Sequence, residues 1–427
     1  MTNLMKMSVN DLQELKQKLL KNHQECKNMK LKLDMSRGRP CSEQLDLSMG
    51  MLDCLDTYKS IDGIDCRNYS AGVEGLREAR ELFGQMLDAG PDEIIIGGNA
   101  SLNIMYDIIA RAMIFGVLGS DIPWGRLPKV KFLCPSPGYD RHFAICEQFG
   151  IEMITIDMKA DGPDMDTIEK LVSKDELIKG IWCVPKYSNP EGITFSDEVV
   201  DRFAKLRTKA TDFRIFWDNA YAVHHLTDKP DVLKDILKAC KDAGNPNSVL
   251  IFGSTSKISF SGAGISMLAA SKENINFIIK QMSIQTIGPD KLNQLRHVKF
   301  FKSVENIENH MKKHAEILKP KFDMVLGIFE TELGDKNIAW WNKPKGGYFI
   351  SLNVLDGCAG KSVAMAKDAG VILTNTGATY PYGKDPHDRN IRIAPTLPPL
   401  DELKKAIAVF CICIQLVCID KILESRQ

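Results

Sequence analysis

A lysine, an aspartate and a tyrosine lie in two short segments and could together serve an electron-accepting cofactor. Asp218 and Tyr221 stand three residues apart in FWDNAYAVHH, and Lys257 lies in GSTSKISFSGAG nearly forty residues later. A lysine amine forms imines with carbonyls, a carboxylate keeps a heterocyclic nitrogen protonated, and a phenol donates to an oxyanion. Each residue alone could be an ordinary turn or surface residue, so the hypothesis depends on their order along the chain.

A third segment is suited to a phosphate group. GGNASLNIMYD follows the apolar run EIII and therefore predicts a strand, a small-residue turn and the start of a helix. Free N–H groups and the helix dipole at such a turn favour an anion, so Asn99, Ala100 and Ser101 are expected to form a phosphate cup. Ser254 and Ser256 precede the lysine and add hydroxyl donors. This combination is what pyridoxal 5′-phosphate (PLP) requires of a protein.

Apolar runs separated by amphipathic stretches predict the sheet that positions these residues. The expected strands are 93–98, 130–135, 151–157, 180–185, 213–218 and 248–254. Unalternating apolar strands between helices indicate a mostly parallel sheet that is covered on both faces. Ligands gather at the carboxyl ends of such strands, and the candidate residues follow those ends or lie on loops near them.

The remaining segments indicate a second, smaller α+β domain. Helices are expected over 11–30, 304–334 and 401–423, and strands within 346–354 and 390–395. The chain of 427 residues exceeds the roughly 250–300 at which one core stops growing. The expected division is an N-terminal segment that joins the small domain (1–45), a large PLP-binding domain (46–300) and a small C-terminal domain (301–427).

Composition excludes some partners and indicates a compartment. The 55 Lys and Arg balance the 55 Asp and Glu, which removes the simplest argument for nucleic acid or a membrane surface as a partner. The 12 cysteines are scattered without a C-x-x-C motif, as in a reducing cytosol. No signal-peptide core is visible near the N-terminus, and the apolar stretch 406–419 is shorter than the about 20 residues of a membrane span. A cytoplasmic protein is expected.

Eleven blocks in order resemble the class I (fold type I) PLP-dependent aminotransferases, most closely the bacterial aspartate aminotransferases of type Ic. They are SRGRP, RNYSAGVEGLREAR, GGNASL, CPSPGYDRHF, YSNPEG, WDNAYAVHHL, GSTSKISFSGAGIS, QTIGPDKLNQLRHV, PKGGYF, TNTGATYPYGKDP and NIRIAPT. The resemblance implies an α/β fold in which a large domain has a mostly parallel sheet of the seven-stranded type between helices. It also implies a smaller α+β domain and a homodimer with shared active sites.

The resemblance assigns roles to residues around the cofactor ring. Lys257 matches the lysine that binds the cofactor as an imine and then moves a proton at the substrate α-carbon. Asp218 matches the acid that pairs with the ring nitrogen. Asn189, in NPEG, and Tyr221 match the donors to the phenolic oxygen, and Tyr139, in PGYD, is similar to the aromatic residue that stacks on the ring.

Three further residues resemble groups that bind the substrate or the partner's cofactor. Arg392 in IRIAP matches the arginine that binds the substrate α-carboxylate, for which a planar fork suits bidentate recognition. Gly38 in SRGRP resembles the glycine whose backbone contacts the same carboxylate. Tyr69 in RNYSAG is similar to the tyrosine that reaches the cofactor phosphate of the partner subunit.

The chain departs from many class I enzymes beside the lysine. Those enzymes carry a phosphate-binding arginine in a block like G-L-R-I-G, whereas this chain reads SGAGIS over 261–266. Ser254, Ser256, the cup at 99–101 and a partner group near 288–293 are then expected to neutralise the phosphate. Recognition of a side-chain carboxylate needs another cation, and the candidates are Arg37, Arg141, Lys291 and Arg296.

Other motifs carry weaker hypotheses. The glycines of SGAGIS do not extend to G-x-G-x-x-G, so a dinucleotide site is not expected. His310 and His314 in HMKKH lack the glutamate of H-E-x-x-H, and we interpret them as part of a solvated helix face rather than as metal ligands. His224 and His225 follow the Asp218 loop, where a supporting hydrogen-bond role is expected.

The sequence thus predicts a transaminase that uses PLP, with L-aspartate and 2-oxoglutarate as the expected substrates and no metal. Two alternatives keep the cofactor, namely an aromatic or kynurenine-type transaminase and a C–S β-lyase, since a fold does not fix a reaction. A third alternative is the non-catalytic aminotransferase-like domain of a transcription regulator. Only about 40 residues precede the domain and they contain no basic recognition helix, which disfavours that alternative.

Overall fold

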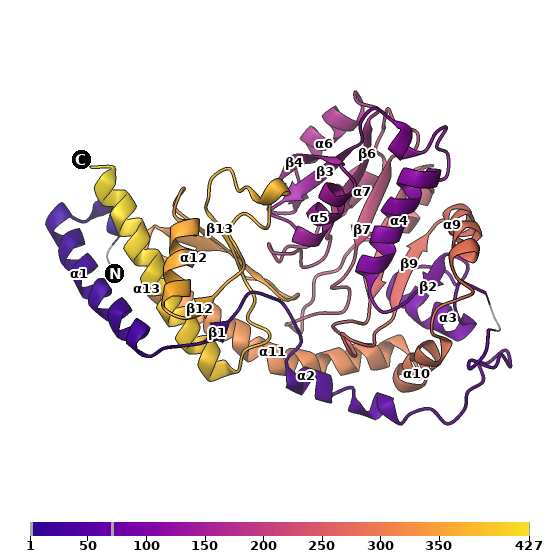
Figure 1. Cartoon of the computed structure of the whole chain (residues 1–427), viewed down its shortest axis with the longest axis horizontal. Coiled ribbons are helices and arrows are strands. Elements are labelled where there is room, and N and C mark those ends of the chain that lie inside the picture. Colours follow the sequence, from indigo (N-terminus) through magenta and orange to yellow (C-terminus); the bar gives the residue numbers. More distant parts are fainter. Residues whose placement is uncertain (1–2, 70–71, 427) are drawn as a thin grey trace.

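We describe a computed structural model of the chain that covers residues 3–69 and 72–426. Its largest element is an eight-stranded sheet in the order β2-β9-β8-β7-β6-β3-β4-β5 (Figure 1). The strands are β2 (Ile94–Ile96), β3 (Lys131–Ser136), β4 (Glu152–Lys159), β5 (Gly162–Pro163), β6 (Ile178–Cys183), β7 (Arg214–Asp218), β8 (Val249–Ser254) and β9 (Ser266–Ala270).

The sheet is mostly parallel, as the sequence predicts. Strands β8, β7, β6, β3 and β4 run parallel to one another, whereas β9 is antiparallel to both β2 and β8. The two-residue strand β5 adds a short antiparallel edge beside β4. The predicted fold class, with a mostly parallel sheet of the seven-stranded type in the large domain, is confirmed, and β9 is a strand that the sequence analysis did not identify.

Alternate residues of each strand enter two different hydrophobic cores. In β7, Ile215 and Trp217 belong to one core and Phe216 to the other, and all three are buried. Helices α4 (Ser101–Phe115), α5 (Asp140–Gln148) and α9 (Lys272–Gln285) cover the second face. The first face is covered by α3 (Arg77–Met86), α6 (Met165–Val172), α7 (Asp197–Ala204) and α8 (Ile236–Asp242). Burial on both faces explains why these strands read as continuous apolar runs.

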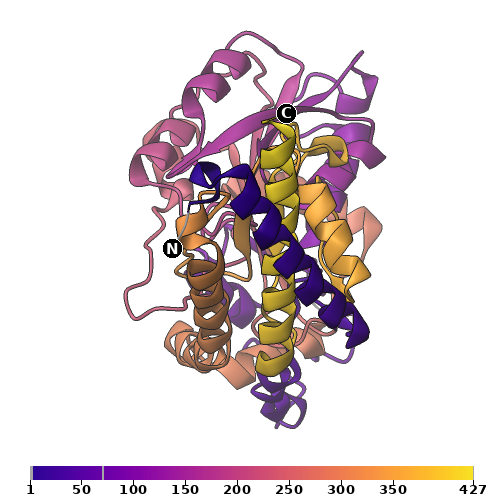
Figure 2. The same ribbon diagram turned by 90° about the vertical axis from the view of Figure 1, so that its left-hand side faces the viewer.

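A second group of elements surrounds a separate core. It contains the antiparallel sheet β10-β11-β13 and the parallel pair β1-β12. The strands are β1 (Leu33–Asp34), β10 (Ala339–Trp341), β11 (Ile350–Val354), β12 (Val371–Ile372) and β13 (Asn390–Ile393). The helices are α1 (Val9–Asn28), α12 (Ala359–Asp368) and α13 (Leu400–Glu424). Figures 1 and 2 show α1 beside α13 with both chain ends nearby, so the first and last segments share this core.

The long helix α11 (Val304–Leu333) connects the two cores. Its residues Ile307 and Met311 pack into the core of the large sheet, whereas Leu318 and Phe322 pack into the second core. Two further helices, α2 (Ser42–Asp46) and α10 (Lys291–Phe301), lie near its N-terminal half (Figure 1). The division at residues 45 and 300 stays our prediction, with α11 as the physical link across it.

Helix α13 is long and apolar enough to cross a membrane by length and composition alone. It has 25 residues, more than the apolar stretch that the sequence analysis considered, and 72% of its most apolar window is buried inside the protein. Its buried side chains, among them Phe410 and Ile414, form the middle of the second core. Its packing is that of the core helix of a folded domain.

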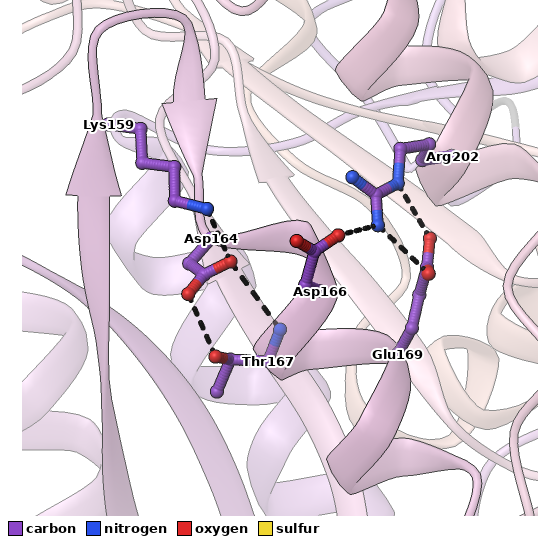
Figure 3. A network of polar contacts seen from close by, with 6 residues as sticks. All are labelled: Lys159, Asp164, Asp166, Thr167, Glu169 and Arg202. Atoms are coloured by element: carbon purple, nitrogen blue, oxygen red, sulfur yellow. Dashed lines mark hydrogen bonds and ion pairs between the residues drawn. The ribbon is translucent and has the colours of Figure 1, made fainter.

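Polar contacts fix the edge of the large sheet that lies beyond β4. Asp164 accepts hydrogen bonds from the Thr167 hydroxyl at 2.8 Å and from Lys159 Nζ at 2.7 Å (Figure 3). These bonds hold the pKa of Asp164 down at about 2, mainly through the lysine. Arg202 of α7 donates to Asp166 and Glu169 of α6 at 2.6–2.9 Å, which joins these neighbouring helices.

A buried ion pair ties the loop before β7 to β6. Lys179 Nζ lies 2.6 Å from Asp212 Oδ1, and the two side chains are only 9% and 6% exposed. The other oxygen of Asp212 accepts from Trp124 Nε1 and from the Ser120 hydroxyl, each at 2.8 Å. Removal of this carboxylate would leave a buried ammonium and two donors without a partner.

We therefore expect Asp212→Ala to lower the free energy of unfolding by about 3–5 kcal/mol, measured as a shift of the urea midpoint. The control is Glu176→Gln, which breaks the exposed Lys209–Glu176 contact of 3.9 Å and should cost less than about 0.5 kcal/mol. Equal shifts for the two variants would show that the Asp212 cluster has no special structural role.

Candidate active site

The candidate residues meet at the carboxyl ends of four neighbouring strands. Tyr139 follows β3, Asn189 follows β6, Asp218 ends β7, and Lys257 follows β8. Because β8, β7, β6 and β3 are adjacent and parallel, their loops converge on one edge of the sheet. Residues separated by more than a hundred positions thereby become neighbours.

Asp218 is the most buried charged group of this cluster, at 3% exposure. His142 Nε2 of α5 lies 3.1 Å from Asp218 Oδ2, and the imidazole stacks on Trp182 with ring centroids 4.4 Å apart. Within the described part of the chain, Asp218 Oδ1 has no hydrogen-bond partner although it is buried. One carboxylate oxygen therefore has a hydrogen-bond partner, and the other can accept a hydrogen bond from a protonated nitrogen of a ligand.

Two phenols lie near this carboxylate. Tyr139 meets His142 edge-on, with centroids 5.0 Å apart, and the buried Tyr221 ring stacks on Tyr348 at 6.1 Å. Burial raises the pKa of both Tyr139 and Tyr221, and the nearby Asp218 charge raises both further. Both side chains are consequently neutral phenols, which can donate a hydrogen bond to an oxyanion.

Lys257 is half-buried and lies over the two stacked rings. Its Nζ lies 5.3 Å from the Tyr221 centroid and 5.7 Å from the Tyr348 centroid. Burial lowers the pKa of the Lys257 amine, and the Asp218 charge offsets part of that effect. A lowered pKa increases the fraction of neutral amine at neutral pH, and the neutral amine is the nucleophilic and basic form.

The expected phosphate cup joins two turns of the chain. The Ser254 hydroxyl donates to Ser256 Oγ and the Ser256 hydroxyl to the Asn99 carbonyl, each at 3.3 Å. The Asn99 side chain is already engaged, since it donates to the Ser261 carbonyl and accepts from Gly264 N at 2.7 Å. Ala100 is the N-cap of α4 and makes no side-chain cap bond, and Ser101 begins that helix. The backbone N–H groups of the first turn of α4 have no partner within the helix and are the donors left for an anion here.

Arg392 of β13 closes the other side of the cluster. Its Nη1 donates to Asp140 Oδ1 at 2.8 Å and to Asn189 Oδ1 at 3.3 Å. Its guanidinium carbon lies 4.9 Å from the centre of the Phe349 ring, and the residue is 6% exposed. Nε is buried without a partner among the residues that the structure describes. The guanidinium is thus held on one side, while Nε is left for another acceptor.

Gly38 lies directly against the same phenylalanine. A Cβ placed on Gly38 would lie 2.6 Å from the tip of the Phe349 ring. The N-terminal segment therefore packs against Phe349, whose ring in turn lies against the Arg392 guanidinium. The close approach of Gly38 to the ring requires a residue without a side chain.

Some predicted residues are not brought to the cluster within one chain. Tyr69 is 77% exposed. Arg37 and Arg141 are exposed, although Arg141 lies close enough to Tyr139 for its charge to offset part of the rise in that residue's pKa. Lys291 and Arg296 are on α10, where Arg296 donates to Asn293 and Lys291 lies against Gly288.

Several neighbours were missed by the sequence analysis. His142 stands three residues after Tyr139 at the start of a helix, and that spacing could have indicated it. Tyr348 of GGYF accepts a hydrogen bond from Gln44 Nε2 at 2.8 Å, and Asp140 pairs with Arg392. The contacts of Tyr348 and Asp140 join segments about 250–300 positions apart, which no local pattern reveals.

The prediction of a solvated face for HMKKH was wrong. His310 and His314 are buried, with His310 Nε2 2.9 Å from the Ile258 carbonyl and His314 Nδ1 3.0 Å from Gln44 Nε2. The lysines between them face the solvent, so the lysine-rich sequence concealed an inward-facing histidine pair. Among the described residues no cluster of three or more metal-ligating side chains is present.

His224 and His225 have different surroundings. His225 Nδ1 lies 2.8 Å from the Tyr187 hydroxyl. His224 packs edge-on against Tyr221 and Tyr348, and neither of its ring nitrogens has a hydrogen-bond partner in the part of the chain that the structure covers. Burial and the Lys257 charge lower the pKa of His224, so it is a neutral ring. A supporting role stays our prediction for both.

Comparison with known proteins identifies the class to which this fold and site belong. The profile of the aspartate amino-transferase family matches residues 7–426. The chain is 49% identical to a putative aminotransferase of Mycolicibacterium smegmatis, over 95% of this chain and 96% of that protein. It is 45% identical to an aspartate aminotransferase of Corynebacterium glutamicum, over 92% of this chain and 91% of the relative.

Solved structures agree with this assignment. An aspartate transaminase from Corynebacterium glutamicum superposes with a TM-score of 0.96 at 42% identity, over 99% of both chains. An α-aminoadipate aminotransferase from Thermus thermophilus, complexed with N-(5′-phosphopyridoxyl)-L-leucine, shares the fold with a TM-score of 0.73 at 16% identity, over 99% of this chain and 97% of that one. The chain belongs to the aspartate aminotransferase family. It is an aminotransferase, as the sequence predicts.

The contact between Gly38 and Phe349 generates a prediction about substrate binding. In Gly38→Ala the new methyl group must displace the Phe349 ring, which packs against the Arg392 guanidinium. The KM for an amino-acid substrate should therefore rise about tenfold, with a smaller change in kcat. Steady-state kinetics on both substrates measures this.

The matched control is Gly327→Ala. Gly327 lies in the interior of α11, and a Cβ there would meet nothing within 4 Å. Its KM should match that of the parent protein. A normal KM for Gly38→Ala would contradict a role for this glycine beside Arg392.

Proposed function

We propose that the protein is a PLP-dependent transaminase that moves an amino group between L-aspartate and 2-oxoglutarate. The observation that carries the proposal is the buried Asp218 carboxylate, whose Oδ1 has no partner among the described residues while Oδ2 is anchored by His142. A buried acceptor of this kind fits a protonated ring nitrogen. Lys257 on the next strand end has the lowered pKa that imine chemistry needs.

The residues present fit the rest of the cofactor. Asn189 and Tyr221 would bind its phenolic oxygen, and Tyr139 would lie on its ring. The phosphate would be held by Ser254, Ser256 and the backbone at Asn99, Ala100 and Ser101, where α4 begins without a side-chain cap. When bound, PLP supplies an aldehyde that forms imines and a ring that accepts electrons.

Each of these residues has a separate role in the proposed reaction. Asp218 would hold a proton on the ring nitrogen of the bound cofactor, and Lys257 Nζ would take the proton from the substrate α-carbon. Tyr221 and Asn189 would donate hydrogen bonds to the phenolic oxygen. Arg392 orients the substrate through its α-carboxylate, while Gly38 permits close approach at that end. Both half-reactions use this one site, so the mechanism is ping-pong.

Recognition of the second carboxylate is part of the proposal. Aspartate and 2-oxoglutarate each carry one, and Arg37, Arg141, Lys291 and Arg296 stay its candidates. Arg141 is supported by its place next to Asp140 at the start of α5 and by its effect on the pKa of Tyr139. Lys291 and Arg296 lie on α10 near the segment that we expect to face a partner subunit.

We also propose a homodimer with shared active sites. Tyr69 is exposed in the single chain, which suits a residue that acts in the partner's site. Large apolar side chains are exposed on α4, in the last turn of α9 and just after it, among them Ile114, Phe115, Ile284 and Ile287, and contiguous exposed apolar surface is typical of interfaces. The twelve unpaired cysteines support a cytoplasmic location for this enzyme.

The decisive experiment for the proposal is a half-reaction spectrum of the protein reconstituted with PLP. Addition of L-aspartate without an oxo acid should convert the imine absorbance to that of the pyridoxamine form, and 2-oxoglutarate should restore it. L-Alanine and L-phenylalanine should convert the spectrum far more slowly at the same concentration.

Lys257→Ala should lose the protein-bound imine band and at least about 10⁴-fold in turnover. Conversion by kynurenine in place of aspartate would favour the aromatic transaminase, and pyruvate release from cystathionine would favour the C–S lyase. No spectral change with any amino acid would favour a non-catalytic domain.

A further inference from the structure

We propose that Asp140 is an internal carboxylate that competes with the substrate carboxylate for Arg392 and thereby weakens the binding of acidic ligands. The inference rests on the proposed function, because it assumes that Arg392 binds the substrate α-carboxylate. It assigns to Asp140 a role in setting affinity and in releasing product. Asp140 lies on α5 beside the large sheet, whereas Arg392 lies on β13 of the second sheet, so the pair also bridges the two cores.

The geometry of the pair is that of a strong, partly shielded ion pair. Asp140 Oδ1 lies 2.8 Å from Arg392 Nη1, with the two side chains 33% and 6% exposed. Within residues 3–69 and 72–426, no other carboxylate lies within ion-pair distance of this guanidinium. The group that we expect to bind substrate thus already holds a carboxylate supplied by its own chain.

Arg392 does not need Asp140 in order to be oriented. Its Nη1 also donates to Asn189 Oδ1 at 3.3 Å, and its guanidinium lies over the Phe349 ring. The residue is paired in the sheet with Ser351 of β11 and is buried. These contacts fix the side chain, so the Asp140 charge is left as the component that acts on an incoming anion.

A substrate carboxylate on the same guanidinium would lie within a few ångströms of Asp140. Like charges at that distance repel, and low exposure strengthens the repulsion. The substrate must therefore either displace Asp140 or bind beside its charge. In both cases the affinity of the arginine for the substrate carboxylate is lower, and the Kd higher, than it would be with a neutral neighbour.

The Asp140 carboxylate is also stabilised when it is not paired with Arg392. It is the first residue of the nine-residue helix α5, whose N-cap, Tyr139, makes no side-chain cap bond. Unpaired N–H groups and the positive end of the helix dipole stabilise a carboxylate there. Displacement is consequently reversible, and the return of Asp140 to Arg392 assists release of the product between half-reactions.

The test is direct binding of maleate to the PLP-loaded enzyme, measured by calorimetry at fixed pH and ionic strength. Maleate carries two carboxylates and no amino group, so its binding does not depend on turnover. Asp140→Asn keeps an oxygen that can accept from Arg392 but removes the charge, and its Kd for maleate should fall roughly five- to tenfold. Asp140→Ser, which removes the charge and offers no amide in its place, should also lower the Kd for maleate.

Glu147→Gln is the matched control, because Glu147 is an exposed acid on the same helix. Its Kd should equal that of the parent enzyme. An unchanged or weaker affinity in both Asp140 variants would overturn the proposal and would make Asp140 a support for Arg392.

Arg392→Ala separates this failure from a failure of the proposed function. Loss of maleate binding in Arg392→Ala confirms that the titration reports on the arginine. If Arg392→Ala binds maleate as tightly as the parent, Arg392 does not bind the substrate carboxylate, and the proposal that Asp140 competes for it is wrong as well.

Discussion

The Asp218 carboxylate lies at the end of a buried strand among aromatic and apolar side chains, where an unpaired charge costs several kcal/mol. His142 compensates one oxygen, and the other oxygen has no partner within the described residues. A protein retains such a group where a ligand completes the pairing. The Asp218 charge raises the pKa values of the two nearby phenols further than burial alone and offsets part of the lowering of the Lys257 pKa, and its partner His142 stacks on Trp182.

The site is built from both halves of the chain. The large sheet supplies Asp218, Lys257 and Asn189, whereas the second group of elements supplies Arg392, Phe349 and Tyr348. The N-terminal segment packs on the second group and on α11, with Gly38 against Phe349 and Gln44 hydrogen-bonded to both Tyr348 and His314. Because Arg392 lies in the second group and the strand ends lie in the large sheet, a movement of one group relative to the other would change the distance between them. In this structure the Asp140–Arg392 pair is a direct polar link across that boundary.

The parts that the sequence predicts correctly are those with local patterns. Continuous apolar runs predict the buried parallel strands, the lysine, aspartate and phosphate-cup segments indicate the cofactor, and eleven sequence blocks in order indicate the family. The antiparallel strand β9 was missed because SMLAA is short and follows a glycine-rich turn. The histidine pair of α11 was misread because local composition does not show which face of a helix turns inward. His142, Gln44 and Asp140 act on residues far away in sequence, so only the fold reveals their partners.

The ring nitrogen of the proposed cofactor, PLP, offers the most direct test of the central claim. We would reconstitute the parent enzyme and Asp218→Asn with PLP labelled with ¹⁵N in the ring and record the ¹⁵N resonance of each. The parent should show a protonated pyridinium nitrogen over the whole range of pH in which it is active, and Asp218→Asn should show an unprotonated nitrogen with little turnover. The same resonance position in both proteins would contradict the account, because the buried carboxylate would then not hold the proton on which the reaction depends.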